Sequence, residues 1–103
     1  MIRGTTPTLT FTIPFEPDNI DKLWITFSQN KTEVFTVEKD AVTFDGHDIV
    51  VRLSQKQTLS LNGNSMVDIQ IRLSFIGDSK DQDALASDII RTSVGEILKD
   101  GEI

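Results

Sequence analysis

The stretch VDIQIRLSF at residues 67–75 decides the fold class of this chain. Apolar and polar side chains alternate along it without interruption, and a period of two is that of a β-strand with one buried and one solvated face. No other stretch of the chain alternates for as long. We therefore expect residues 67–75 to form a central strand of a sheet.

Shorter stretches with the same alternation precede it. They predict strands at residues 8–13, 23–28, 34–37, 42–44 and 49–54. Residue types that favour tight turns stand between several of them, at Gln29–Lys31, Asp45–Gly46 and Asn62–Gly63. This succession of short strands and turns is typical of an antiparallel all-β domain.

Two further segments complete the expected fold. The alternation breaks after Ser54, whose hydroxyl is a favourable helix N-cap, so one helical turn is expected there. The segment Ala84–Val94 fits two structures, because Ala86, Ile90 and Val94 recur at helical spacing while β-branched residues are frequent in it. We favour a strand. About seven strands then form an immunoglobulin-like antiparallel β-sandwich, a single domain over residues 1–103.

Composition excludes several classes of function. The net charge is −6 and the ten Lys and Arg residues are scattered, so neither nucleic acid nor an anionic membrane is an expected partner. The absence of cysteine excludes disulfides, thiolate metal sites and cysteine nucleophiles. No segment resembles a signal peptide or a membrane span. We expect the protein to be made in the cytoplasm of its producing cell and to leave it only within an assembly.

Residues that could carry chemistry are few. His47 is the only histidine and sits between Asp45 and Asp48, but the hairpin turn expected there favours a solvated side chain over a catalytic base. The polar loop expected at residues 77–83 carries three carboxylates, Asp78, Asp81 and Asp83. Loop carboxylates suit hard cations, yet the order of an EF-hand is missing, which favours a solvated acidic loop. We expect no catalytic residues, no cofactor and no metal.

Trp24 is the more informative residue. By parity it points away from the buried face of its strand, and Val50, near Arg52, faces the outer side of its own strand. If these two strands share a sheet, the three side chains form an apolar and cationic patch, and Trp and Arg are favoured interface anchors. An equally supported alternative is that Trp24 covers one end of the sandwich or is capped by a loop.

The two ends of the chain offer further contact surfaces. Beyond the last strand, the tail at residues 96–103 carries the apolar residues Ile97, Leu98 and Ile103. This tail can dock on its own domain or extend as an arm to a neighbouring subunit, and the N-terminal arm through Pro7 has the same two options. Strand edges are also open to pairing with another chain.

Seven segments of the chain resemble a family of small proteins encoded in phages and prophages of Firmicutes and related gut bacteria, among virion structural genes. The segments are Met1–Thr8, Ile25–Gln29, Leu53–Gln55, Thr58–Leu59, Ile69–Leu73, Ala84–Ser87 and Ser93–Gly101. The chain is more weakly similar to the N-terminal sandwich domains of phage baseplate upper proteins. The resemblance implies a role in the tail or baseplate and supplies no catalytic residues.

We therefore expect a non-enzymatic phage structural or accessory protein that contacts other phage structural proteins or copies of itself. It would be assembled into the virion in the host bacterial cytoplasm. One rival hypothesis is a carbohydrate- or cell-surface-binding module, which requires an exposed aromatic platform that only Trp24 can supply. A second rival is an enzyme, which requires a deep pocket with convergent polar groups.

Overall fold

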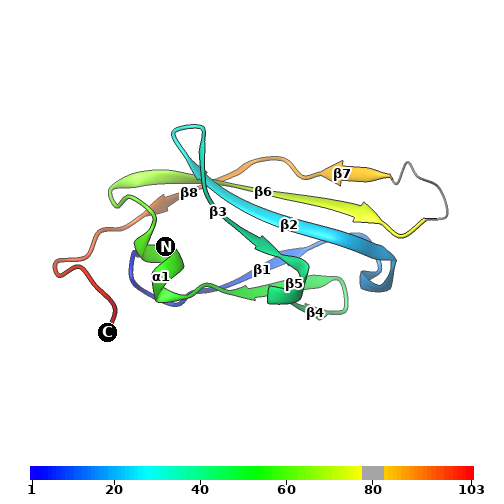
Figure 1. Ribbon diagram of the computed structural model, residues 1–103, viewed down its shortest axis with the longest axis horizontal. Helices are drawn as coiled ribbons and strands as arrows, with labels where there is room; N and C mark the ends of the chain where they lie inside the picture. Colours follow the sequence, from blue (N-terminus) through cyan, green and yellow to red (C-terminus); the bar gives the residue numbers. More distant parts are fainter. Residues whose placement is uncertain (78–82) are drawn as a thin grey trace.

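The alternating stretch at residues 67–75 lies within β6 (Ser65–Phe75), a central strand of the computed structural model, which describes residues 1–77 and 83–103. β6 pairs with β2 (Ile20–Gln29) on one side. β3 (Thr32–Glu38) lies beyond β2, while β7 (Ala84–Ala86) and β8 (Ile90–Val94) share the other side of β6 (Figure 1). These antiparallel strands form the larger of two sheets.

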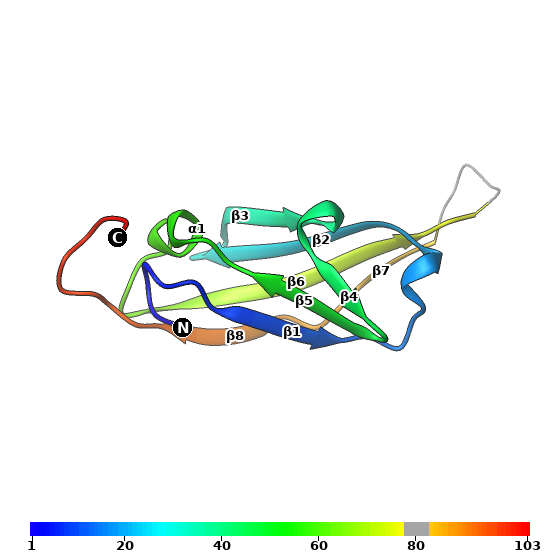
Figure 2. The same ribbon diagram turned by 90° about the horizontal axis from the view of Figure 1, so that it is seen from below.

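The smaller sheet packs against one face of the larger one. It consists, in spatial order, of β1 (Thr8–Thr12), β5 (Asp48–Arg52) and β4 (Thr43–Asp45) (Figure 2). The helical turn α1 (Gln55–Leu59) connects β5 to β6 and so carries the chain from the small sheet to the large one. Two single 3-10 turns, η1 (Pro17–Asn19) and η2 (Lys39–Ala41), precede β2 and β4.

This arrangement confirms the predicted all-β antiparallel sandwich with one short helical turn. The hairpins β2–β3, β4–β5 and β6–β7 each stay within one sheet. In constant-type immunoglobulin domains the second and third strands lie in opposite sheets. The likeness to that fold is therefore one of architecture and not of strand order.

The core fills the space between the two sheets. Alternation directs Leu23, Ile25 and Phe27 of β2 inward, where all three are buried. Phe27 stacks on Phe35 of β3 with ring centroids 4.5 Å apart. The other buried apolar residues come from both sheets and from the segments that join them: Ile13, Ile20, Val37, Ile49, Val51, Leu53, Leu61, Val67, Ile69, Ile71, Leu73 and Val94.

Local sequence signals explain the turns and the helical cap. Asn30 and Lys31, between β2 and β3, have φ angles of 53° and 64°, which a two-residue type I′ hairpin requires. Ser54 Oγ accepts the Gln57 N–H at 3.1 Å, and Gln57 Oε1 accepts the Ser54 N–H at 2.9 Å. This capping box satisfies two amides at the start of α1, so the expected cap is confirmed.

The segment Ala84–Val94 is extended, as favoured, but it forms two strands instead of one. Both pair with β6, and the register changes between them: Arg72 lies opposite Ala86, whereas Ile69 lies opposite Ile90. The segment that joins β7 to β8 therefore contains one residue more than the part of β6 opposite it, as in a β-bulge. Ser87 holds this irregularity, since its Oγ accepts the Ile71 N–H at 3.0 Å and its own N–H donates to the Ile71 carbonyl.

Gln29 is a buried polar residue that joins the β2–β3 hairpin to the segment preceding β6. Only 4% of it is exposed. Its Nε2 donates to the Asn62 carbonyl at 3.0 Å, and its Oε1 accepts the Asn62 N–H at 2.8 Å. The side chain thus replaces backbone pairing where the chain leaves the regular sheet.

Replacing Gln29 by Leu is expected to lower the free energy of unfolding by about 1–3 kcal/mol, because both backbone groups of Asn62 lose their partner at a part-buried site. Gln55→Leu is the matched control. Its amide makes the same pair of bonds to Ile103, but in an exposed position, so water replaces them and the loss stays within about 0.5 kcal/mol. Urea unfolding compares the two variants, and equal losses would contradict this account.

Candidate interaction surfaces

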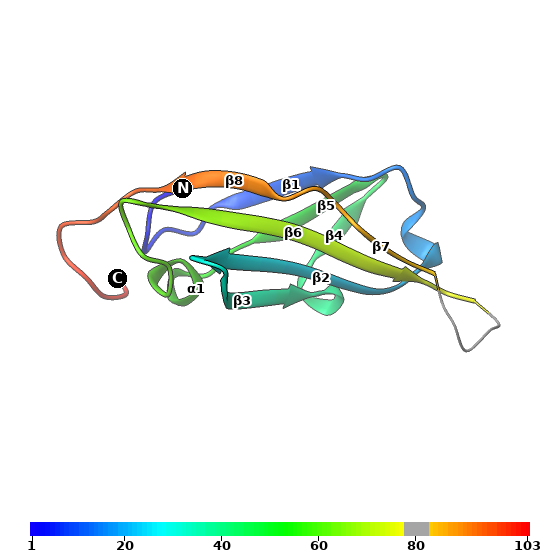
Figure 3. The ribbon, with the colours of Figure 1, turned by 90° about the horizontal axis from the view of Figure 1, so that it is seen from above.

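One long side of the sandwich is open. β1 is an edge of the small sheet, β7 and β8 form an edge of the large sheet, and these edges run along the same side of the molecule (Figures 2 and 3). Between them lies a groove of about 480 Å³. Its large apolar lining residues come from both sheets and from the segment after β1: Phe11, Ile13, Phe15, Ile71, Leu73, Leu85 and Ile90.

The groove exists because the small sheet does not cover the edge of the large one. Leu85 lies opposite Leu73 in the sheet, and Ile90 lies opposite Ile69, so both share the inward face with buried residues. Leu85 is nevertheless 47% exposed and Ile90 is 44% exposed, whereas Leu73 and Ile69 are buried. Inward-facing apolar side chains are therefore left without a covering strand.

The two edges beside the groove differ in how they are protected. Edge strands normally carry charges, prolines or bulges that prevent pairing with another chain. The β7–β8 edge has the irregularity at Ser87. β1 has the sequence TLTFT and contains neither charge nor proline, and among the described residues none that lines the groove is charged. β1 is therefore the less protected edge.

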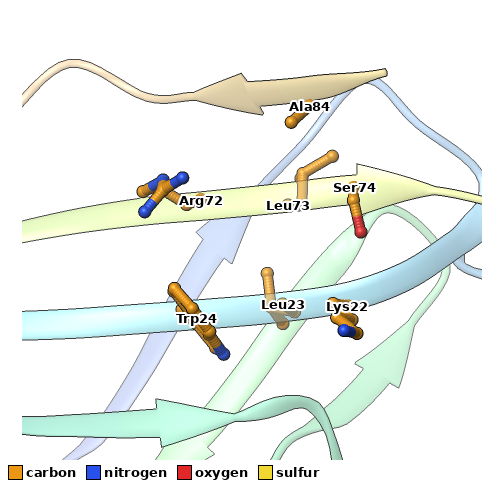
Figure 4. Close-up of a pocket in the computed structure, with 7 residues that line it drawn as sticks. All are labelled: Lys22, Leu23, Trp24, Arg72, Leu73, Ser74 and Ala84. Carbon is orange, nitrogen blue, oxygen red and sulfur yellow. The ribbon is translucent and has the colours of Figure 1, made fainter. Parts of the chain in front are cut away.

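Trp24 points outward from the large sheet, as predicted, and is 43% exposed. The predicted patch with Val50 and Arg52 is wrong, because these residues lie on β5 in the small sheet while Trp24 lies on β2 in the large one. The arginine at Trp24 is Arg72, its cross-strand neighbour on β6, whose guanidinium carbon is 5.4 Å from the indole centroid (Figure 4).

Sequence reasoning missed Arg72, Leu85 and Ile90. Arg72 stood on the polar face of the most obvious strand, but only the pairing register places it opposite Trp24. Leu85 and Ile90 belong to the segment with two possible structures. Their exposure depends on the width of the opposing sheet, for which no local sequence signal exists.

The N-terminal arm docks on its own domain. Ile2 and Gly95 form an isolated parallel bridge, and the Arg3 N–H donates to the Gly95 carbonyl at 3.0 Å. The Arg3 guanidinium donates to the carbonyls of Leu61 at 2.7 Å and Leu59 at 3.0 Å. The arm is therefore part of the folded domain, because it is hydrogen-bonded to the C-terminal end of α1, to Leu61 and to Gly95, which follows β8.

The C-terminal tail is attached through the same guanidinium. Arg3 forms ion pairs with Glu96 at 2.9 Å and Asp100 at 3.2 Å. Ile97 is half-buried beside Gly4, where an added Cβ would lie 3.1 Å from its Cδ1. The backbone of the last residue, Ile103, pairs with the side chain of Gln55. The tail thus docks on its own domain.

Docking of the tail buries only some of the apolar residues that were predicted to contact a partner. Ile97 is used within the domain, whereas the side chains of Leu98 and Ile103 are fully exposed. Val50 is half-buried on β5, and Arg52 is exposed and donates to Thr6 Oγ1 at 3.3 Å. Leu98 and Ile103 stay candidates for contact with a partner.

His47 lies in the β4–β5 hairpin and its side chain is 51% exposed. Its Nδ1 is 3.1 Å from the Phe15 carbonyl, and its Nε2 is 3.6 Å from a Glu16 oxygen. Asp48 instead accepts the Thr12 hydroxyl at 2.6 Å. His47 therefore contacts the segment after β1, and its ring nitrogens face neither Asp45 nor Asp48.

The acidic loop lies mostly outside the described residues, which include Asp83 but neither Asp78 nor Asp81. Within residues 1–77 and 83–103, no three His, Asp or Glu side chains gather as they would around a metal ion. None of the helices in this part of the chain is long and apolar enough to span a bilayer.

No family model, curated protein or solved structure matches the chain. The resemblance to phage structural proteins therefore stays a prediction from the sequence.

Glu96 makes the attachment of the tail sensitive to pH. Its carboxylate accepts the Ile97 N–H and the Arg3 guanidinium, and these bonds lower the pKa of the carboxyl below its ordinary value. Because the pKa of Glu96 is lowered in the folded state, these bonds stabilise the docked tail at a pH above the ordinary pKa of a glutamate. That stabilisation is lost as the pH falls through the folded-state pKa. We expect the tail to detach on acidification before the core unfolds.

The NMR signals of the Arg3 Nη–H groups and of the Ile97 amide, whose donors bond to Glu96, are followed during an acid titration and measure this detachment. In the Glu96→Gln variant, which keeps the shape but not the charge, these signals should lose the titration step due to Glu96. Wild-type signals that stay unchanged until the whole protein unfolds would contradict the assignment.

Proposed function

We propose that this protein is a non-enzymatic structural or accessory domain of a phage virion, in its tail or baseplate, that acts through protein–protein contacts. The observation that supports this best is the open side of the sandwich. We further propose that the groove between β1 and the β7–β8 edge accepts an extended, apolar segment of another virion protein.

Strand pairing supplies one part of the recognition. β1 pairs only with β5 within the described residues, so half of its backbone groups are available to a strand added at the edge. β1 also lacks the charges and prolines that oppose such addition. An added strand would continue the small sheet over the uncovered part of the large one.

Apolar burial supplies the other part. Leu85 and Ile90 each leave nearly half of their surface exposed in the groove. Covering them would contribute roughly 1 kcal/mol each, since complete burial of such a side chain stabilises by about 1.5–3 kcal/mol. An alternating segment has the right pattern, because its apolar side chains enter the groove while its polar ones face solvent.

Charge favours a different protein over a second copy as the occupant. Each copy carries a net charge of −6, so two copies repel one another. The groove itself is lined by uncharged residues, and a neutral segment enters it without an unpaired charge being buried. The sequence resemblance to phage structural proteins supports the virion setting, where subunits make repeated symmetric contacts.

The proposal is tested in particles purified from a producing host. Mass spectrometry is expected to find the wild-type chain in the particles. Leu85→Asp should lower its incorporation at least tenfold, because the variant places a charge in the apolar groove. Ser93→Asp, on the exposed outward face of β8, is the matched control with the same charge change and should be incorporated normally.

Circular dichroism confirms that both variants are folded before the comparison. A wild-type chain that is absent from the particles overturns the virion assignment. A Leu85→Asp chain that is incorporated as well as the Ser93→Asp control overturns the role of the groove.

A further inference from the structure

The outer face of the large sheet carries a second, chemically different hollow. Two cross-strand pairs lie side by side on it: Trp24 faces Arg72, and Lys22 faces Ser74. Ala84 of β7 lies opposite Ser74 on the other side. These residues surround a hollow of about 150 Å³ (Figure 4).

Side-chain size explains the hollow. Ser74 and Ala84 are short, whereas their neighbours Lys22, Trp24 and Arg72 are long, so the surface is depressed over the two short residues. The Ser74 hydroxyl is buried and has no hydrogen-bond partner within the part of the chain that the structure describes. A buried hydroxyl without a partner is costly, and an incoming oxygen atom would provide one.

The charged residues around the hollow favour an anionic ligand. Among residues 1–77 and 83–103, neither Lys22 nor Arg72 takes part in an ion pair, so both cations are available to an anion. The charged residues that line a neighbouring depression beside Trp24 are of both signs, three acidic and two basic: Asp21, Lys22, Glu38, Lys39 and Asp40. Lys39 there already donates to the Ile20 carbonyl at 2.6 Å. An anion is therefore favoured on the Arg72 side of the indole, where the charged residues are both cationic.

Trp24 orients the guanidinium. The Cζ atom of Arg72 is 5.4 Å from the centroid of the Trp24 indole, so a cation–π contact holds the guanidinium. A guanidinium fixed in this way presents paired N–H donors, which match the two oxygens of a carboxylate. Less motion is then lost when an anion binds.

We propose that this hollow binds a carboxylate-bearing sugar unit, of the hexuronate type, with its carboxylate on Arg72 and Lys22 and a ring hydroxyl on Ser74. The volume, equal to about five waters at ~30 Å³ each, admits a carboxylate and the adjoining part of one ring. The half-exposed indole of Trp24 offers an apolar surface to the rest of that ring. The site lies on the face of the sheet away from the groove, so it does not depend on the proposed protein contact.

Trp24 is the only tryptophan of the chain, so its fluorescence and its indole NMR signal report on ligand binding at this hollow. Glucuronate is titrated into the full chain while the fluorescence and the NMR signal of the indole Nε1–H are recorded. Neutral methyl glucoside and acetate are titrated in parallel. We expect saturable changes with glucuronate and at least tenfold weaker binding of the other two.

Two variants locate the ligand. Arg72→Gln should weaken glucuronate binding at least tenfold, and Ser74→Ala should weaken it severalfold without changing any charge. Arg52→Gln, an equal loss of charge at an exposed arginine of the other sheet, should leave binding unchanged. The indole NMR signal serves as the readout where removal of Arg72 alters the fluorescence.

Acetate that binds as tightly as glucuronate overturns the sugar assignment, because an anion alone then accounts for the site. Absence of glucuronate binding, or equal weakening by Arg52→Gln and Arg72→Gln, overturns the site itself.

Discussion

The pairing of β2 with β6 is the interaction on which the rest of the structure depends. Its register sets Leu23 against Leu73, Ile25 against Ile71 and Phe27 against Ile69, so the inward faces of both strands form the centre of the core. Because side chains alternate between faces, a slip of one residue would turn the inward apolar residues of the slipped strand towards solvent. The hydrophobic pattern therefore specifies this register strongly.

The same register determines the outer surface. When the apolar residues are matched inside, Trp24 must meet Arg72 outside, and Lys22 must meet Ser74. The cationic hollow beside the indole is thus a consequence of core packing and of two short side chains. The groove has a different origin, because the two sheets differ in width. The small sheet ends at β1, so Leu85 and Ile90 on the β7–β8 edge of the large sheet are left uncovered.

The sequence predicts what depends on local patterns and misses what depends on contacts between distant segments. Alternation and turn residues located the strands through β6, and the Ser54 cap located α1. The pairing of strands carries no such signal, which is why Arg52 was expected beside Trp24 instead of Arg72. The irregularity at Ser87 escaped prediction because it depends on a side chain that bonds to the backbone of another strand.

The ends of the chain show the same limit. Either docking or extension of the arms was compatible with their sequence. Docking is decided by Arg3, whose guanidinium bonds to the carbonyls of Leu59, the last residue of α1, and Leu61, and to carboxylates of the tail. All of these groups are more than fifty residues away from it in the sequence. With both arms engaged at one end of the molecule, the open side between β1 and the β7–β8 edge is left as an apolar surface for a partner, beside the exposed side chains of Leu98 and Ile103.

Residue-resolved hydrogen exchange of the free chain and of the chain within purified particles tests this account most directly. It predicts that amides of β1 and of the β7–β8 edge gain protection in the particle, while those of the other edges, β3 and β4, exchange as they do in the free protein. Protection gained at β3 or β4 with β1 unchanged would contradict the claim that the open side is the docking surface.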